Sequence, residues 1–166
     1  MLPTYEVFEA ALTLFHRTSV QNEELVRQLR LRGILPEVPR AGFSVLDLGA
    51  GQGRLPRLLA PWADPLILVE PNPRCVELLR GEFPHVSPNR WGEPARDEVR
   101  RDHPGGFSLV TMSHMLYHLG GLDDIREKVA LALGLLEPGG HLVVVINQEP
   151  EQIGRASCRE RVSVVV

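Results

Sequence analysis

The sequence predicts an α/β protein with a doubly wound, mostly parallel sheet, and three observations support this prediction. From Phe43 onward, short apolar runs typical of buried strands alternate with amphipathic, helix-like segments. A glycine-rich turn lies between the first apolar run and the helix that follows it. The chain has 166 residues, of which 43% are apolar, and this is enough for one compact core. We therefore expect one α/β domain that is preceded by helices.

Two helices are predicted before the sheet. Apolar residues recur at helical spacing between Tyr5 and Phe15, which indicates a first amphipathic helix. In the second helix, Thr18 and Gln21 have the spacing of a capping box, and Gly33 is placed to end the helix. Residues 1–40 are therefore predicted to form an N-terminal helical segment.

The strands and helices of the sheet are predicted after residue 40. Parallel strands that are buried on both faces have continuous apolar runs, and the helices between them carry an apolar stripe. Strands are predicted at residues 43–49, 66–70, 107–113 and 141–147, with a weaker strand near 85–87. Helices are predicted at residues 53–62, 73–83, 93–102 and 122–136. This order gives repeated strand–helix–strand units, which is typical of a doubly wound sheet.

The glycine-rich turn is the stretch VLDLGAGQGRL, in which Asp47 ends the strand and Gly49, Gly51 and Gly53 follow at alternate positions. Because glycine has no Cβ, the chain can turn sharply and a ligand can lie against its backbone. The helix that follows offers free N–H groups, and open α/β sheets bind ligands at this edge. A dinucleotide fingerprint requires glycine where Arg54 stands, so the pattern disfavours a nicotinamide cofactor.

The D-x-G-x-G-x-G turn resembles the first motif of the class I S-adenosylmethionine-dependent methyltransferases, and three further motifs follow in the family's order. Glu70 ends the second strand in LILVEPNP, FSLVTMSHMLYHL resembles the fourth strand with its loop, and LLEPGGHLVVV resembles the turn and fifth strand. The resemblance covers residues 43–147 and implies a Rossmann-like methyltransferase fold with S-adenosyl-L-methionine as cofactor. A weaker resemblance, to histamine N-methyltransferase and related small-amine enzymes, extends over the native part of the chain.

The resemblance also implies a cofactor site. In the family, the glycine loop supports the methionine part of the cofactor, and the acid at the position of Glu70 accepts hydrogen bonds from both ribose hydroxyls. A carboxylate suits this role because it has two acceptor oxygens and no donor. Two alternatives stay open: Asp47 could simply cap the turn, and Glu70 could be an acid at the start of a helix. The predicted cofactor-binding residues are Asp47, Gly49, Ala50, Gly51, Gly53, Glu70, Pro71, Glu93 (as the adenine contact) and Ser113.

Three residues after the fourth strand are the catalytic candidates, namely His114, Tyr117 and His118. They lie where the loop would face the methyl group, so one of them could deprotonate or orient the acceptor. The alternative is that they only line the pocket or pack at the surface. The two histidines are four residues apart, as in a metal pair, but a third ligand is not evident and no metal is predicted.

The predicted function is S-adenosylmethionine-dependent methyl transfer to a small-molecule acceptor, with an amine as one candidate. The alternatives are a nucleotide-binding oxidoreductase and a cofactor-binding protein or inactive fragment without catalysis. The net charge of −3 argues against a nucleic-acid partner, because such proteins usually carry clustered excess Lys and Arg. The sequence shows no export signal and no membrane-length apolar run, so a cytoplasmic protein without a membrane partner is predicted. The oligomeric state is left open.

The last segment of the chain is predicted to have a different origin. The stretch IGRASCRERV resembles a translation of common sequencing-adapter DNA, so residues 153–166 are predicted to be a non-native tail. In this interpretation the methyltransferase domain occupies residues 41–152 and is incomplete, truncated after the fifth strand. The alternative is that Cys158, which is flanked by arginines, is a reactive thiol.

Overall fold

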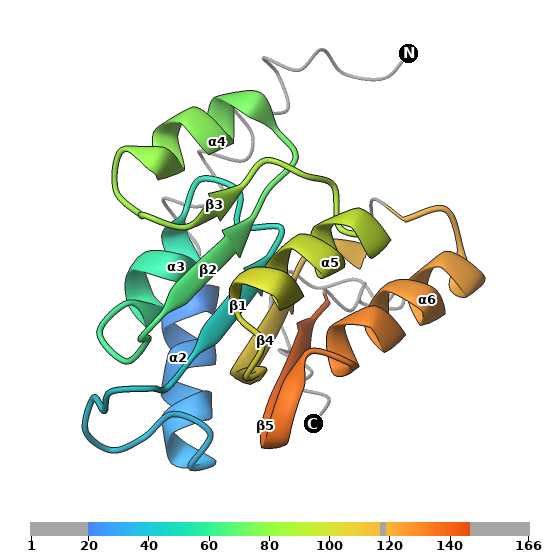
Figure 1. Ribbon diagram of the computed structural model, residues 1–166. Helices are drawn as coiled ribbons and strands as arrows, with labels where there is room; N and C mark the ends of the chain where they lie inside the picture. Colours follow the sequence, from blue (N-terminus) through green and yellow to red (C-terminus); the bar gives the residue numbers. More distant parts are fainter. Residues whose placement is uncertain (1–19, 117–118, 147–166) are drawn as a thin grey trace, which may run out of the picture.

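The computed structural model describes residues 20–116 and 119–146, which form a five-stranded sheet with helices on both faces (Figure 1). The strand order is β3-β2-β1-β4-β5, and every neighbouring pair is parallel. The predicted doubly wound α/β class is therefore confirmed. The first predicted helix, between residues 5 and 15, and the predicted tail at residues 153–166 lie outside the described residues.

Strands β1 to β4 lie within segments that the sequence predicts as strands, and β5 overlaps its predicted segment. The bounds are β1 Val45–Leu48, β2 Leu66–Val69, β3 Val86–Ser87, β4 Phe107–Ser113 and β5 Leu136–Val145. The central strand β1 pairs with β2 on one side and β4 on the other. After β3, the chain crosses over to begin β4 beside β1, so the switch point of the sheet lies between β1 and β4. In open α/β sheets, ligands bind beyond the carboxyl ends of the strands at such a switch point.

Five helices lie within the described residues, and they cover the two faces of the sheet (Figure 1). Their bounds are α2 Gln21–Leu31, α3 Arg54–Leu59, α4 Pro73–Arg80, α5 Glu93–Asp102 and α6 Leu122–Leu133. Buried leucines of α2, α3 and α4 form one apolar cluster with the sheet, and residues of α5 and α6 form a second cluster. Burying apolar surface on both faces is the main source of stability for this three-layer arrangement.

The fifth strand differs from its prediction. The sequence places a Pro-Gly-Gly turn before a strand that begins at His141, whereas β5 begins at Leu136 and contains the turn as a bulge. Leu136 pairs with Phe107, and the register then shifts before Leu109 pairs with His141. A Cβ on Gly140 would stand 2.5 Å from the backbone oxygen of Phe107. The bulge therefore lies directly against β4, at a distance that only glycine allows.

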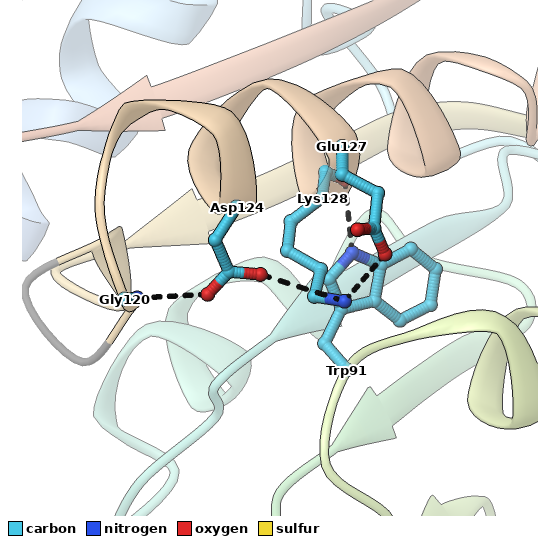
Figure 2. A network of polar contacts seen from close by, with 5 residues as sticks. All are labelled: Trp91, Gly120, Asp124, Glu127 and Lys128. Atoms are coloured by element: carbon cyan, nitrogen blue, oxygen red, sulfur yellow. Dashed lines mark hydrogen bonds and ion pairs between the residues drawn. The ribbon is translucent and has the colours of Figure 1, made fainter.

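A polar network joins the connection between β3 and α5 to helix α6 (Figure 2). Trp91 is 3% exposed, and its Nε1 donates a hydrogen bond of 3.0 Å to the backbone carbonyl of Lys128. The Nζ atom of Lys128 lies 2.7 Å from Glu127 and 3.6 Å from Asp124. Asp124 also accepts a 2.8 Å hydrogen bond from the backbone N–H of Gly120. These contacts hold the loop before α6 and the connection after β3 to the same helix.

We expect Trp91→Phe to lower the free energy of unfolding by about 1 to 2 kcal/mol, since it removes a buried donor and some ring volume. The matched control is Lys128→Met, which removes the ion pairs and keeps the backbone carbonyl. Its expected loss is about 0.5 kcal/mol or less, because the paired carboxylates are partly exposed. Urea unfolding followed by circular dichroism measures both values. A loss for Lys128→Met as large as that for Trp91→Phe would contradict the expectation that the indole contributes more to this junction than the ion pairs do.

Candidate cofactor-binding site

The glycine loop connects β1 to α3 at the switch point. Gly49, Gly51 and Gly53 have φ values of 79°, 55° and 81°, a region that glycine enters without the cost that a Cβ imposes. The backbone N–H of Gly49 donates to the carbonyl of Val69 at 2.8 Å, which fastens the loop to the end of β2. A Cβ on Gly53 would stand 2.7 Å from Cδ2 of Leu79, whereas a Cβ on Gly51 would meet no atom within 4 Å. The backbone at Gly51 is therefore open to a ligand.

Glu70 follows β2 and is 7% exposed. Its Oε2 accepts a 2.8 Å hydrogen bond from the N–H of Gly51, and its Oε1 accepts one of 2.8 Å from the N–H of Asn72. Helix α4 is capped by Asn72, whose side chain accepts from the N–H of Arg74 at 3.0 Å, so Glu70 is not the capping residue. A carboxylate has about four acceptor positions, and Glu70 can therefore hold the loop and still accept from a ligand.

Asp47 lies on β1 beneath the glycine loop and is 2% exposed. It pairs in register with Thr111 of β4, and the Thr111 hydroxyl donates a hydrogen bond to its carboxylate. Burial raises the pKa of Asp47 to about 7, the hydrogen bond from Thr111 opposes this rise, and the negative charge of Glu70 adds to it. The carboxyl group thus joins β1 to β4 at the switch point, and a contact with the cofactor stays a prediction.

His114 directly follows β4 and has a positive φ of 56°, in the left-handed region. Its N–H donates to the carbonyl of Val145 at 3.0 Å, and its ring Nε2 lies 2.8 Å from Oε1 of Gln21, the first residue of α2. The next residue, Met115, contacts the glycine loop, because a Cβ on Gly49 would stand 3.0 Å from Cβ of Met115. The structure therefore brings the loops after β1 and β4 together, as the predicted site requires.

The remaining predicted residues divide into two groups. Ala50 is buried within the glycine loop, and Ser113 is half-buried at the end of β4, so both lie at the switch-point edge. Pro71 is exposed after Glu70, and Glu93 is exposed as the first residue of α5. The catalytic candidates Tyr117 and His118 lie outside the described residues, as does Thr18, the predicted capping partner of Gln21.

Two polar features of this edge were not predicted from the sequence. One is Gln21, which the pattern suggested only as a capping residue. The other lies after β3, where the Ser87 hydroxyl donates to Glu98 at 3.2 Å and the Asn89 amide donates to the same carboxylate. The signal for the second feature was available, because Ser87 and Asn89 are polar residues at the carboxyl end of a strand.

Two negative observations concern only residues 20–116 and 119–146. No group of three or more His, Cys, Asp or Glu side chains in these ranges is arranged to hold a metal ion. No helix in the same ranges is long and apolar enough to cross a membrane. Since His118 is outside these ranges, the predicted absence of a metal site stays a prediction.

A parallel sheet with an open glycine loop at its switch point, next to a buried acid that follows the neighbouring strand, has the architecture of the α/β domains that bind ligands at this edge. The family model for the methyltransferase domain matches residues 16–156 of this chain. The chain belongs to this methyltransferase family. The predicted resemblance to the class I methyltransferases is thereby confirmed, while the kinship to histamine N-methyltransferase stays a prediction.

Individual methyltransferases are similar to this chain in sequence or in structure. The ubiquinone biosynthesis O-methyltransferase of Thiobacillus denitrificans is 29% identical over 133 residues, which are 76% of this chain and 56% of that protein. Two solved structures show the same fold. The N-methyltransferase NodS from Bradyrhizobium japonicum, in complex with S-adenosyl-L-homocysteine, has a TM-score of 0.57 at 22% identity. This match covers 74% of the present chain and 60% of the NodS chain. The amino pentose methyltransferase CalS10 from Micromonospora echinaspora, bound to S-adenosylmethionine, has a TM-score of 0.62 at 23% identity. This match covers 92% of the present chain and 61% of the CalS10 chain.

The chain spans about half the length of the curated relatives that it matches, from 41% to 56%. At 22% and 23% identity, the likeness to the solved structures shows the fold. The likeness in fold does not by itself identify the methyl acceptor.

Proposed function

We propose that the protein transfers a methyl group from S-adenosyl-L-methionine to an amine nitrogen of a small molecule. The observation that carries the cofactor part of this proposal is the buried Glu70 carboxylate, which holds Gly51 of the open loop at the switch point. The two structural relatives described above support the nitrogen acceptor, since one is an N-methyltransferase and the other an amino pentose methyltransferase. The proposed domain covers residues 41–152, with residues 1–40 as its helical segment.

The residues of the glycine loop and Glu70 fit this cofactor. Glu70 offers acceptor oxygens to the two ribose hydroxyls, which are donors, and it carries no N–H that would compete. The open space at Gly51 lets a ligand reach the backbone, and a side chain at this position would fill that space. When bound, S-adenosyl-L-methionine supplies an electrophilic methyl group on a positively charged sulfur.

His114 is the proposed proton acceptor of the reaction. An amine near neutral pH is mostly an ammonium ion and has no lone pair on its nitrogen, so the acceptor must lose a proton before it can be methylated. Imidazole is suited to this role because its ordinary pKa is close to neutrality. His114 lies at the end of β4, next to Met115, which contacts the glycine loop. Tyr117 and His118 are further candidates for orienting the acceptor.

Calorimetry and a transfer assay test the two parts of this function. The chain is titrated with S-adenosyl-L-homocysteine and, separately, with NAD, and only the first is expected to bind. Transfer of a labelled methyl group is then measured on small primary amines and on the matching alcohols and phenols. We expect transfer to the amines alone. Tighter binding of NAD would contradict the cofactor, and transfer to oxygen alone would contradict the acceptor.

A further inference from the structure

Two acids, one before α4 and one after it, contact the glycine loop. Glu70, before α4, accepts directly from the N–H of Gly51 at 2.8 Å. Glu82, after α4, acts through Arg57 of α3. The Nε and Nη2 atoms of Arg57 donate to the two carboxylate oxygens of Glu82 at 2.7 and 2.6 Å. Because both oxygens are engaged, this bidentate pair fixes the plane of the guanidinium.

The remaining donor nitrogen of Arg57 contacts the backbone of the loop. Its Nη1 donates a 3.0 Å hydrogen bond to the carbonyl of Gln52, the residue between the second and third loop glycines. The N–H of the same peptide group belongs to Gly53, and it donates to the carbonyl of Ala50 at 2.9 Å. One peptide group of the loop is therefore bonded at both polar atoms, through its N–H within the turn and through its oxygen to α3.

The peptide group between Gln52 and Gly53 depends on such contacts because glycine does not fix its orientation. Gly53 has a φ of 81°, and glycine, which has no Cβ, adopts negative φ about as readily, so the group can turn over. In the turned-over orientation its oxygen would face the carbonyl oxygen of Ala50, and the turn would lose its hydrogen bond. The hydrogen bond from Arg57 therefore favours the orientation that keeps the turn closed.

The Arg57–Glu82 ion pair is better suited to orienting the loop than to stabilising the fold. The two side chains are 43% and 41% exposed, and exposed ion pairs contribute little to the free energy of unfolding. Hydrogen bonds from Arg57 hold the pKa of Glu82 below its ordinary value, so the carboxylate stays charged near neutral pH. We propose that Arg57 is a positioning residue that holds the Gln52–Gly53 peptide group in the orientation that the cofactor requires, and that Glu82 orients Arg57. This inference rests on the proposed function, in which the cofactor lies against the backbone of the loop.

Amide hydrogen exchange of the full chain, measured by NMR without cofactor, tests the positioning directly. In Arg57→Met, we expect the N–H of Gly53 to exchange roughly tenfold faster than in the wild type, because the turn opens more often. The matched control is Arg27→Met, since Arg27 forms a 2.6 Å ion pair with Glu24 that is also exposed and lies on α2. In this control the exchange of Gly53 should equal that of the wild type. An unchanged rate in Arg57→Met would overturn the inference.

Isothermal titration calorimetry with S-adenosyl-L-homocysteine gives the second readout. Arg57→Met is expected to weaken binding roughly fivefold to tenfold, because affinity falls with the fraction of chains in the competent orientation. Arg27→Met should bind as the wild type does. Faster exchange of Gly53 without weaker binding would refute the positioning role. If the wild type itself does not bind S-adenosyl-L-homocysteine, the proposed function is contradicted, and the exchange rates alone decide whether Arg57 positions the turn.

Exchanging the two charges separates positioning from the ion pair itself. The double variant Arg57→Glu, Glu82→Arg restores the ion pair, but the carboxylate introduced on α3 has no hydrogen to donate to the carbonyl of Gln52. Its midpoint of urea unfolding is expected within about 0.5 M of the wild type, whereas its Gly53 exchange and affinity should resemble those of Arg57→Met. Wild-type affinity in the double variant would mean that the ion pair alone matters, against the inference. If Arg57→Met does not fold, the double variant decides by the same two readouts.

Discussion

Glu70→Ala is expected to weaken the binding of S-adenosyl-L-homocysteine roughly 100-fold, since hydrogen bonds to a charged group contribute about 1.5 to 3 kcal/mol. The substitution removes the acceptor proposed for the ribose hydroxyls. It also removes the carboxylate that accepts hydrogen bonds from the N–H groups of Gly51 and Asn72. The glycine loop and the connection after β2 therefore each lose a contact that shapes the site. Isothermal titration calorimetry of the purified variants measures the loss.

Two further substitutions separate these effects. Glu70→Gln keeps one acceptor oxygen and replaces the other with an amide donor, so a smaller loss, about tenfold, is expected. Glu77→Ala is the matched control because Glu77 is exposed on α4, the helix that follows Glu70. Its affinity should equal that of the wild type. If Glu70→Ala binds as tightly as the control, another residue holds the ribose.

Asp47→Asn is expected to stabilise the fold by an amount that grows with pH. Burial raises the folded-state pKa of Asp47 from 3.8 to about 7, so between these values the folded protein holds a proton that the unfolded chain has released. The free energy of unfolding of the wild type therefore falls by roughly 1 kcal/mol for each pH unit in this interval. Asparagine carries no charge and avoids this cost, and its side-chain oxygen can still accept from Thr111. Above about pH 7 the difference between the two proteins becomes constant, because Asp47 is then ionised in both states.

Urea unfolding of both proteins at several values between about pH 5 and pH 8 measures this difference. The variant is expected to gain a few kcal/mol over that range relative to the wild type. Asp123→Asn is the control, because the side chain of Asp123 is 97% exposed and its substitution should give the same difference at every pH. A constant difference for Asp47→Asn would show that Asp47 is already ionised in the folded protein at the lowest pH.

The elements that the sequence predicted best are those whose signals are local. The bounds of β4 and α5 agree with their predicted segments, because a continuous apolar run marks the strand and a Glu-Pro pair begins the helix. The position of Glu70 directly after an apolar strand was predicted for the same reason, while its contact with the ribose stays a prediction. The bulge in β5 could not be predicted, because it arises where Gly140 approaches Phe107, a contact between distant segments.

Properties of the site that depend on tertiary packing could not be predicted from the sequence either. Gln21 and His114 are 93 residues apart, so their hydrogen bond exists only because α2 packs beside the end of β4. The sequence marked His114 as a candidate but gave no reason to pair it with Gln21. Likewise, the pKa of Asp47 follows from its burial between strands, which the motif alone does not measure.

The parallel pairing of β1 with β4 has a consequence for the order in which the site forms during synthesis. Glu70 and Gly51 are only 19 residues apart, so the half of the site proposed for the cofactor can close soon after β2 has been translated. The contact between Thr111 and Asp47 spans 64 residues, and the one between His114 and Gln21 spans 93. Closing longer loops costs more entropy and slows folding. A ribosome-bound chain would therefore complete its proposed cofactor loop first and its proposed acceptor side last.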